Sequence, residues 1–231
     1  MRYQHLDLQG NTVALPVGKV VCIGQNYQDH ITEMNSKTAP DALFFLKPAT
    51  ALRHFSAPLE IPHDRGAVHN ETEIAVLIGK PLIAVTPDLV MDAVWGYSLA
   101  LDLTLRDVQA ELKKLGRPWD IAKGFDGACP VAGFVPAAQV ADAQALTFSL
   151  DVNGERRQTG DATLMIRGIA QMISEMSYWF SLQPGDIVLT GTPAGVGPLQ
   201  VGDQLQLRLN NYFSAQSMVS GDPALAVRSG E

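Results

Sequence analysis

The 231-residue sequence has only two cysteines, Cys22 and Cys129, and no long apolar run. One cysteine lies in the strand-like stretch KVVCIG and the other in the turn-like GACPV, so we expect reduced structural thiols rather than a disulfide or a catalytic thiol. A membrane-spanning helix needs about 20 consecutive apolar residues. Residues 1–16 also lack the apolar core of a secretory signal. These absences predict a cytoplasmic protein.

Positive charge is scarce as well. The net charge is −7, so we expect neither nucleic acid nor an anionic membrane surface as a partner. No internal repeat, low-complexity tract or Gly/Ser linker divides the chain. Because 46% of the residues are hydrophobic, the chain can bury a substantial core, and we predict one domain.

Several segments rich in valine, isoleucine and leucine are bounded by glycine, proline or aspartate, a pattern typical of β-strands. The expected strands are residues 19–24, 42–46, 71–79, 96–103, 146–152, 186–190 and 204–209. With only two clear helices, over 104–116 and 162–180, the pattern predicts an α+β fold.

The first helix is predicted to begin at Thr104, which has capping-box spacing to Asp107, and to end at Gly116. Its apolar stripe would consist of Leu105, Val108, Leu112 and Leu115. Arg106 and Gln109 would then lie off the buried side.

Three carboxylates stand beside apolar strands. Glu71 and Glu73 are two residues apart in HNETEIAVLIGK and would share a strand face, while Asp102 follows the apolar GYSLAL. If they meet, a hard divalent cation would relieve their repulsion, and oxygen ligands favour Mg²⁺, Mn²⁺ or Ca²⁺ over Zn²⁺. Alternatively, the glutamates lie on a solvated face. Asp102 fits that alternative less well, because an unpaired carboxylate in an apolar run is costly.

Other polar residues suggest acid–base chemistry. His30 and Glu33 are one helical turn apart, so the carboxylate could orient the imidazole as a general base, although such pairs are also common on surface turns. Lys123, in AKGFD, could stabilise a developing negative oxygen or extend its charge into water. The stretch TGTPAGVG lacks the nucleotide-loop patterns, but Thr192 and its backbone amides could receive a carboxylate.

The order of these motifs is distinctive. The chain reads G-x-N-Y-x-x-H-x-x-E-M, then F-L-K-P, E-T-E, L-A-L-D-L-T-L-R-D-V-Q, A-K-G-F-D and G-D-I-V-L-T-G-T-P-x-G-V-G-P. From about residue 19 to 209 it closely resembles the fumarylacetoacetate hydrolase family, in particular its short acylpyruvate hydrolases and oxaloacetate decarboxylases. The resemblance implies a β-rich mixed sandwich or roll with peripheral helices, usually a homodimer. Residues 19–231 would form the catalytic domain and residues 1–18 an extension.

The resemblance also implies roles for nine residues. Mg²⁺ or Mn²⁺ would be held by Glu71, Glu73 and Asp102. His30 and Glu33 would be a catalytic dyad on a lid, Lys123 an active-site lysine, and Arg106, Gln109 and Thr192 substrate contacts. One departure is Asn70, where close relatives often have histidine; this position should point away from the two glutamates.

The implied activity is metal-dependent hydrolysis of the C–C bond of acylpyruvates, such as acetylpyruvate or fumarylpyruvate, to pyruvate and a carboxylic acid. His30 would activate the water, and the same machinery would decarboxylate oxaloacetate without water. The alternatives are an oxaloacetate tautomerase, a hydroxy-dienoate isomerase and a non-catalytic keto-acid-binding protein.

Overall fold

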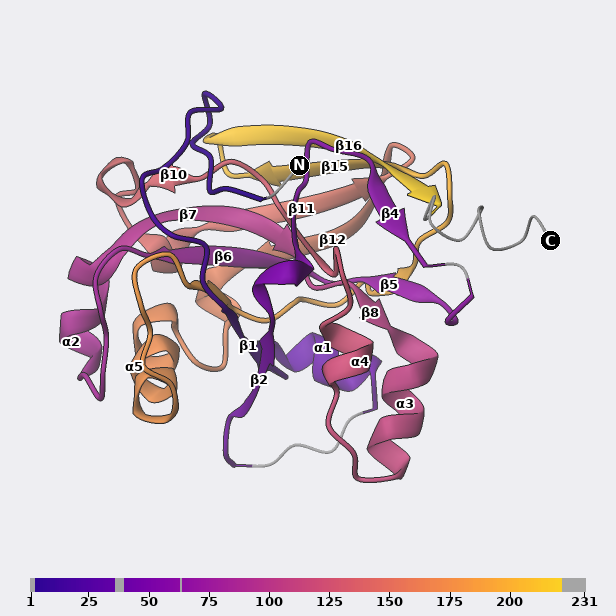
Figure 1. Cartoon of the computed structure of the whole chain (residues 1–231), viewed down its shortest axis with the longest axis horizontal. Coiled ribbons are helices and arrows are strands. Elements are labelled where there is room, and N and C mark those ends of the chain that lie inside the picture. The colour runs from indigo at the N-terminus through magenta and orange to yellow at the C-terminus, as the bar shows by residue number, and fades with distance from the viewer. Residues whose placement is uncertain (1–2, 36–39, 63, 222–231) are drawn as a thin grey trace.

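The computed structural model describes residues 3–35, 40–62 and 64–221. Its strands form sheets of eight, five and three strands, and α1, α3 and α4 gather at one end of the large sheet (Figure 1). This arrangement confirms the predicted α+β fold with peripheral helices. None of the described helices is both long enough and apolar enough to span a bilayer.

The eight-stranded sheet has the order β2-β1-β13-β6-β7-β9-β3, with β10 also paired to β7. Its strands are β1 (Val20–Gly24), β2 (Leu43–Lys47), β3 (Leu52–His54), β6 (Thr72–Ile78), β7 (Val94–Leu101), β9 (Cys129–Val131), β10 (Val135–Pro136) and β13 (Ile187–Leu189). The five-stranded sheet, ordered β12-β11-β15-β16-β4, contains β4 (Leu59–Ile61), β11 (Thr147–Val152), β12 (Glu155–Asp161), β15 (Gln204–Leu209) and β16 (Phe213–Gly221). The small sheet joins β5 (Val68–Asn70), β8 (Thr104–Leu105) and β14 (Gly197–Pro198).

The helical elements are short. The α-helices are α1 (Gln28–Glu33), α2 (Pro87–Val90), α3 (Arg106–Lys114), α4 (Asp120–Lys123) and α5 (Ile169–Trp179). The 3₁₀ turns are η1 (Ala49–Ala51), η2 (Met91–Ala93), η3 (Ala137–Gln139), η4 (Ala143–Ala145) and η5 (Ala162–Leu164).

Strand β6 is buried on both faces. Ile74, Val76 and Ile78 pack into the core that the large sheet shares with β11 and β15, whereas Ala75 and Leu77 pack into a second core on the opposite face. The predicted alternation of β15 fits this packing, because Leu205, Leu207 and Leu209 all enter the first core. Burial on both faces explains why β6 reads as a continuous apolar run.

The described residues before β1 help to cover the second core. Tyr3 and Val13 pack in it, and the buried His5 places Nε2 3.0 Å from the carbonyl oxygens of both Pro16 and Gly185. Cys22 and Cys129 lie in this core as free thiols, as predicted. Burial raises the pKa of the Cys129 thiol to about 12, which suits an unreactive structural residue.

The first predicted helix begins later than expected. Residues Thr104 and Leu105 form β8, which pairs with β5, so the capping-box interpretation is wrong. The Thr104 hydroxyl donates to the Asp102 carbonyl at 3.0 Å, and Asp107 accepts from the Ala67 amide at 3.1 Å.

The faces of this helix also differ from the prediction. Gln109, expected off the buried side, is only 3% exposed, whereas Leu115 is 53% exposed. Gln109 can face the interior because it meets polar groups there, among them Arg106, whose Nη1 donates to Gln109 Oε1.

The second predicted helix, 162–180, is split into η5 and α5. Between them, the Asn26 carbonyl accepts from the Ile166 amide at 2.9 Å, and Asn26 Oδ1 accepts from the Arg167 amide at 2.8 Å. These contacts replace helical hydrogen bonds, so α5 starts only at Ile169.

Candidate active site

The three predicted carboxylates meet at the ends of the central strands. Glu71 lies between β5 and β6, Glu73 on β6 and Asp102 directly after β7; one oxygen from each lies within 4.8 Å of the others. The antiparallel register pairs Glu73 with Ala100, and the Asp102 amide donates to the Glu71 carbonyl at 2.7 Å. All three residues are at most 5% exposed, so the solvated-face alternative is wrong.

Three cations balance these acids. Lys123, on α4, places its ammonium 2.7 Å from both Glu71 Oε2 and Asp102 Oδ2. Arg106, at the start of α3, pairs with Glu71 Oε1. Lys47, on β2, lies 2.7 Å from Asp102 Oδ1 as an ion pair, without the alignment of a hydrogen bond. The charges are therefore matched, which a buried cluster of this kind requires.

The carboxyl groups titrate differently. Burial favours the neutral form of Glu71, but Lys123 and Arg106 outweigh it and hold its pKa well below the usual range. Burial, then Asp102 and Glu71, raise the pKa of Glu73 well above that range. Although burial favours a neutral amine, Asp102 and Glu71 raise the pKa of Lys123, which stays charged. The metal-free cluster can thus hold a proton on Glu73.

The predicted dyad faces the same cluster. His30 Nδ1 lies 3.3 Å from Glu33 Oε2 on α1, and Glu33 Oε1 accepts from the Gly195 amide at 2.9 Å. His30 lines a cavity with Glu71, Glu73, Asp102, Arg106, Gln109, Lys123 and Thr192, so eight of the nine predicted residues share it. Glu33 reaches it through His30. The two side chains are therefore in contact beside the cavity, and their role as a catalytic dyad stays a prediction.

This cavity is small. Its volume is about 40 Å³, compared with roughly 300–1,000 Å³ for a typical ligand pocket. Ile31 of α1 and Met34, directly after this helix, form part of its wall. Helix α1 and the residue after it therefore limit the space at the polar site.

The three predicted substrate contacts are partly committed to protein groups. Arg106 Nη1 donates to Gln109 Oε1 at 2.7 Å. The Thr192 hydroxyl donates to the Thr72 carbonyl at 3.0 Å and accepts from Gln158 Nε2 at 2.8 Å. Thr192 is thus held in place by the protein.

Sequence reasoning overlooked Lys47 and Gln158. Lys47 is fully buried and donates to the carbonyls of Leu103, Lys123 and Ala128. Its signal was a lysine ending an apolar strand, the pattern that drew attention to Asp102. Asn70 points away from the carboxylates, as expected, and donates to Gln158 Oε1 at 2.9 Å.

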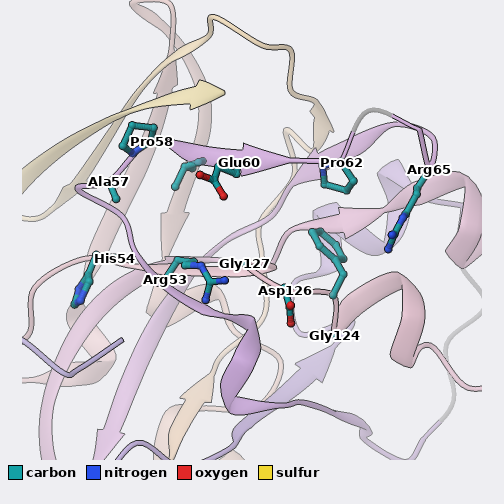
Figure 2. A pocket seen from close by; sticks show the side chains of 12 residues that line it. Arg53, His54, Ala57, Pro58, Glu60, Pro62, Arg65, Gly124, Asp126 and Gly127 are labelled. Carbon is teal, nitrogen blue, oxygen red and sulfur yellow. The ribbon is translucent and has the colours of Figure 1, made fainter. Parts of the chain in front are cut away.

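A wider pocket of about 920 Å³ lies elsewhere, beside β3, β4 and the turn after α4 (Figure 2). None of the nine predicted residues lines it. Its lining charges are mixed, with Arg53, Arg65, Glu60 and Asp126, and Arg53 Nη1 donates to the backbone carbonyls of Thr50 and Leu52. Size alone therefore does not identify the polar site.

Comparison with known proteins agrees with the motifs. The model of the fumarylacetoacetate (FAA) hydrolase C-terminal family matches residues 19–220. An oxaloacetate tautomerase of Escherichia coli (strain K12) is 52% identical over 91% of this chain and 96% of its own length. A mitochondrial oxaloacetate tautomerase of Homo sapiens is 44% identical over 84% of this chain and 88% of its own length.

Solved structures lead to the same family. A fumarylacetoacetate hydrolase family protein from Yersinia pestis CO92 has a TM-score of 0.92 and 51% identity, covering 94% of this chain and 100% of that one. Fumarylpyruvate hydrolase from Pseudomonas aeruginosa, in complex with Mn²⁺ and pyruvate, has a TM-score of 0.89 and 34% identity, covering 96% and 97%. This chain belongs to the fumarylacetoacetate hydrolase family.

Proposed function

We propose that this protein is an oxaloacetate tautomerase, which interconverts the enol and keto forms of the acid. The observation that carries the proposal is a histidine base held by Glu33 against a buried cluster of acids and cations. Two relatives that match most of the chain, at 52% and 44% identity, are named oxaloacetate tautomerases. This reaction was an alternative to hydrolysis in the sequence analysis.

Glu71, Glu73 and Asp102 would hold Mg²⁺ or Mn²⁺. The three buried carboxylates supply only oxygen ligands, the type that these cations prefer. When bound, such an ion polarises the keto and carboxylate oxygens of a 2-oxo acid.

The charge balance favours a doubly charged substrate. Once Glu73 has lost its proton, the three carboxylates would balance the charges of Lys47, Lys123 and Arg106. A divalent cation would leave two positive charges, which the two carboxylates of oxaloacetate would neutralise. Arg106 and Gln109 would hold a carboxylate, and Thr192 would fix the wall beside it.

Proton transfer would be the task of His30. Its imidazole would take a proton from C3 of the keto acid. The electrons of that C–H bond would form the C2–C3 double bond, and the π electrons of the C2 carbonyl would move onto its oxygen. Lys123, which stays charged, would stabilise this oxyanion. The imidazolium would then give its proton to the oxygen, which completes the enol, and the reverse sequence forms the keto acid. Glu33 would orient the imidazole and stabilise its cation.

Acylpyruvate hydrolysis is the second candidate. It is favoured by the fumarylpyruvate hydrolase neighbour at 34% identity, whose structure contains Mn²⁺ and pyruvate. There His30 would remove a proton from water, and the resulting hydroxide would attack the acyl carbonyl at C4. The C3–C4 bond would then break to leave the pyruvate enolate, which would take a proton at C3. Decarboxylation of oxaloacetate would need no such water. The homodimer and the cytoplasmic location stay predictions from the sequence.

The experiment compares two rates, the loss of enol-oxaloacetate and the release of pyruvate. Ultraviolet absorbance reports loss of enol-oxaloacetate, and a coupled dehydrogenase assay reports pyruvate from oxaloacetate, acetylpyruvate and fumarylpyruvate, each with Mg²⁺, Mn²⁺ or chelator. We expect metal-dependent enol loss far faster than pyruvate release. Metal-dependent pyruvate release from an acylpyruvate that exceeds tautomerisation would instead establish the hydrolase.

Matched histidine variants test the base. His30→Gln should lower the tautomerisation kcat by about 100-fold to 10,000-fold, the usual contribution of a positioned general base. His54→Gln is the control, because His54 lies outside this cavity, against the Tyr3 ring. Equal rates in both variants would exclude His30 as the base.

A further inference from the structure

The turn between β13 and β14 contacts two different parts of the polar site. At its start, the Gly191 amide donates to Glu73 Oε2 at 2.5 Å. Near its end, the Gly195 amide donates to Glu33 Oε1 at 2.9 Å. One short segment therefore joins a carboxylate of the triad to the carboxylate that contacts His30.

Gln158, on β12 of the five-stranded sheet, forms side-chain hydrogen bonds to this turn. Its Nε2 donates to Thr192 Oγ1 at 2.8 Å and to the Pro193 carbonyl at 3.0 Å. Its Oε1 accepts from Asn70 Nδ2 and from the Thr72 amide, both at 2.9 Å. The amide thus uses both donors and two acceptor positions while only 1% exposed.

Asn70 completes the contact to the far end of the turn. Its Nδ2 also donates to the Gly195 carbonyl at 3.3 Å. Gly195 has a φ of +98°, and a Cβ there would lie 2.0 Å from the Arg157 carbonyl oxygen. The turn therefore lies directly on β12, where the amides of Asn70 and Gln158 fix its peptides.

We propose that Gln158 and Asn70 are positioning residues. They hold the turn in the place where the Gly195 amide can donate a hydrogen bond to Glu33 when α1 covers the site. They act on the reaction through Glu33 and His30, and they touch neither substrate nor metal. The effect on turnover rests on the proposed tautomerase function. The effect of the two residues on the position of the turn is independent of that function.

The triad should be less sensitive than the dyad to loss of Gln158. Glu73 lies on β6, which is paired on both sides by β13 and β7. Glu33, in contrast, lies on the short helix α1 and reaches the turn through the Gly195 amide. Loosening the turn should therefore free Glu33 before it moves Glu73.

The test compares Gln158→Met with Gln206→Met. Gln206 is on β15 of the same sheet; its Nε2 donates to the Ser214 hydroxyl at 2.9 Å and its Oε1 accepts from Arg208, away from the turn. We expect Gln158→Met alone to raise amide hydrogen exchange of Gly191, Thr192, Ala194 and Gly195 and to lower kcat, each by about tenfold, the effect of losing a buried hydrogen bond. KM and the Mn²⁺ dissociation constant should change by less than about threefold.

A double-mutant cycle identifies the route. Because Gln158 would act through Glu33, the kcat of Gln158→Met/Glu33→Gln should match that of Glu33→Gln alone. Additive losses, unchanged exchange of the turn, or an Mn²⁺ affinity that falls as far as kcat would each overturn the proposal. If Gln158→Met does not fold, Asn70→Ser replaces it with the same expected exchange.

Hydrogen exchange and Mn²⁺ binding need no substrate. A wild-type protein without tautomerase activity would refute the proposed function, and these two measurements would still decide whether Gln158 and Asn70 hold the turn.

Discussion

Replacing Lys47 with methionine should strongly destabilise the metal-free protein. The ammonium is fully buried, lies 2.7 Å from Asp102 Oδ1, and donates to the carbonyls of Leu103 and Ala128 at 3.3 and 3.1 Å and to that of Lys123. Removing one partner of a buried ion pair costs about 3–5 kcal/mol. Asp102 keeps Lys123 as a second cation, but three carbonyls lose a donor at about 1 kcal/mol each.

We therefore expect Lys47→Met to lose about 3–5 kcal/mol of an unfolding free energy that is typically about 5–15 kcal/mol. Urea unfolding in chelator, followed by circular dichroism, measures the loss. Lys19→Met is the control, because Lys19 pairs with Asp186 at 31% side-chain exposure and should lose about 1 kcal/mol or less. Similar losses in the two variants would show that burial of the Lys47 pair contributes nothing.

Two groups with shifted pKa values lead to pH-dependent predictions. Burial, Asp102 and Glu71 raise the pKa of Glu73, so Mn²⁺ binding should release a proton and its affinity should rise with pH. Calorimetry in buffers of different ionisation enthalpy measures this release, and an enthalpy independent of buffer would contradict it. Burial lowers the pKa of His5, so its contribution to stability is complete above about pH 6.5 and is lost as pH falls through its lower folded value. Urea midpoints should thus fall less between pH 7 and 5 in His5→Gln than in wild type; parallel curves would refute a role of His5.

The carboxylate cluster was predictable only in part from local patterns. Asp102 interrupts an apolar run, where burial without a partner is costly. Glu71 and Glu73 stand at the start of such a run and could equally have faced solvent, so their place in the cluster was predicted from the family resemblance. The predicted strands around them were confirmed. Ile74 and Leu99, for example, lie in strands β6 and β7 and are buried. Lys47 breaks the same rule and was overlooked because lysine is usually able to reach water.

The second sheet was harder to predict. Strands β12 and β16, ERRQTGD and FSAQSMVSG, are polar and lie mainly at the surface. Their strand conformation depends on pairing with β11 and β15, which no local pattern encodes. Gln158 was missed for that reason, since its partners come from distant segments. Thr104 likewise joined a sheet because β5 lay beside it.

Glu33 links the position of the short helix α1 to the orientation of the His30 imidazole. One Glu33 oxygen contacts His30 and the other accepts from the Gly195 amide. A displacement of the helix would therefore also change the orientation of the imidazole. A keto acid too bulky for α1 to close over could still occupy the cationic site, but it would meet an unaligned base. Discrimination against large substrates should then appear in kcat rather than in KM, so that poor substrates act as tight competitive inhibitors.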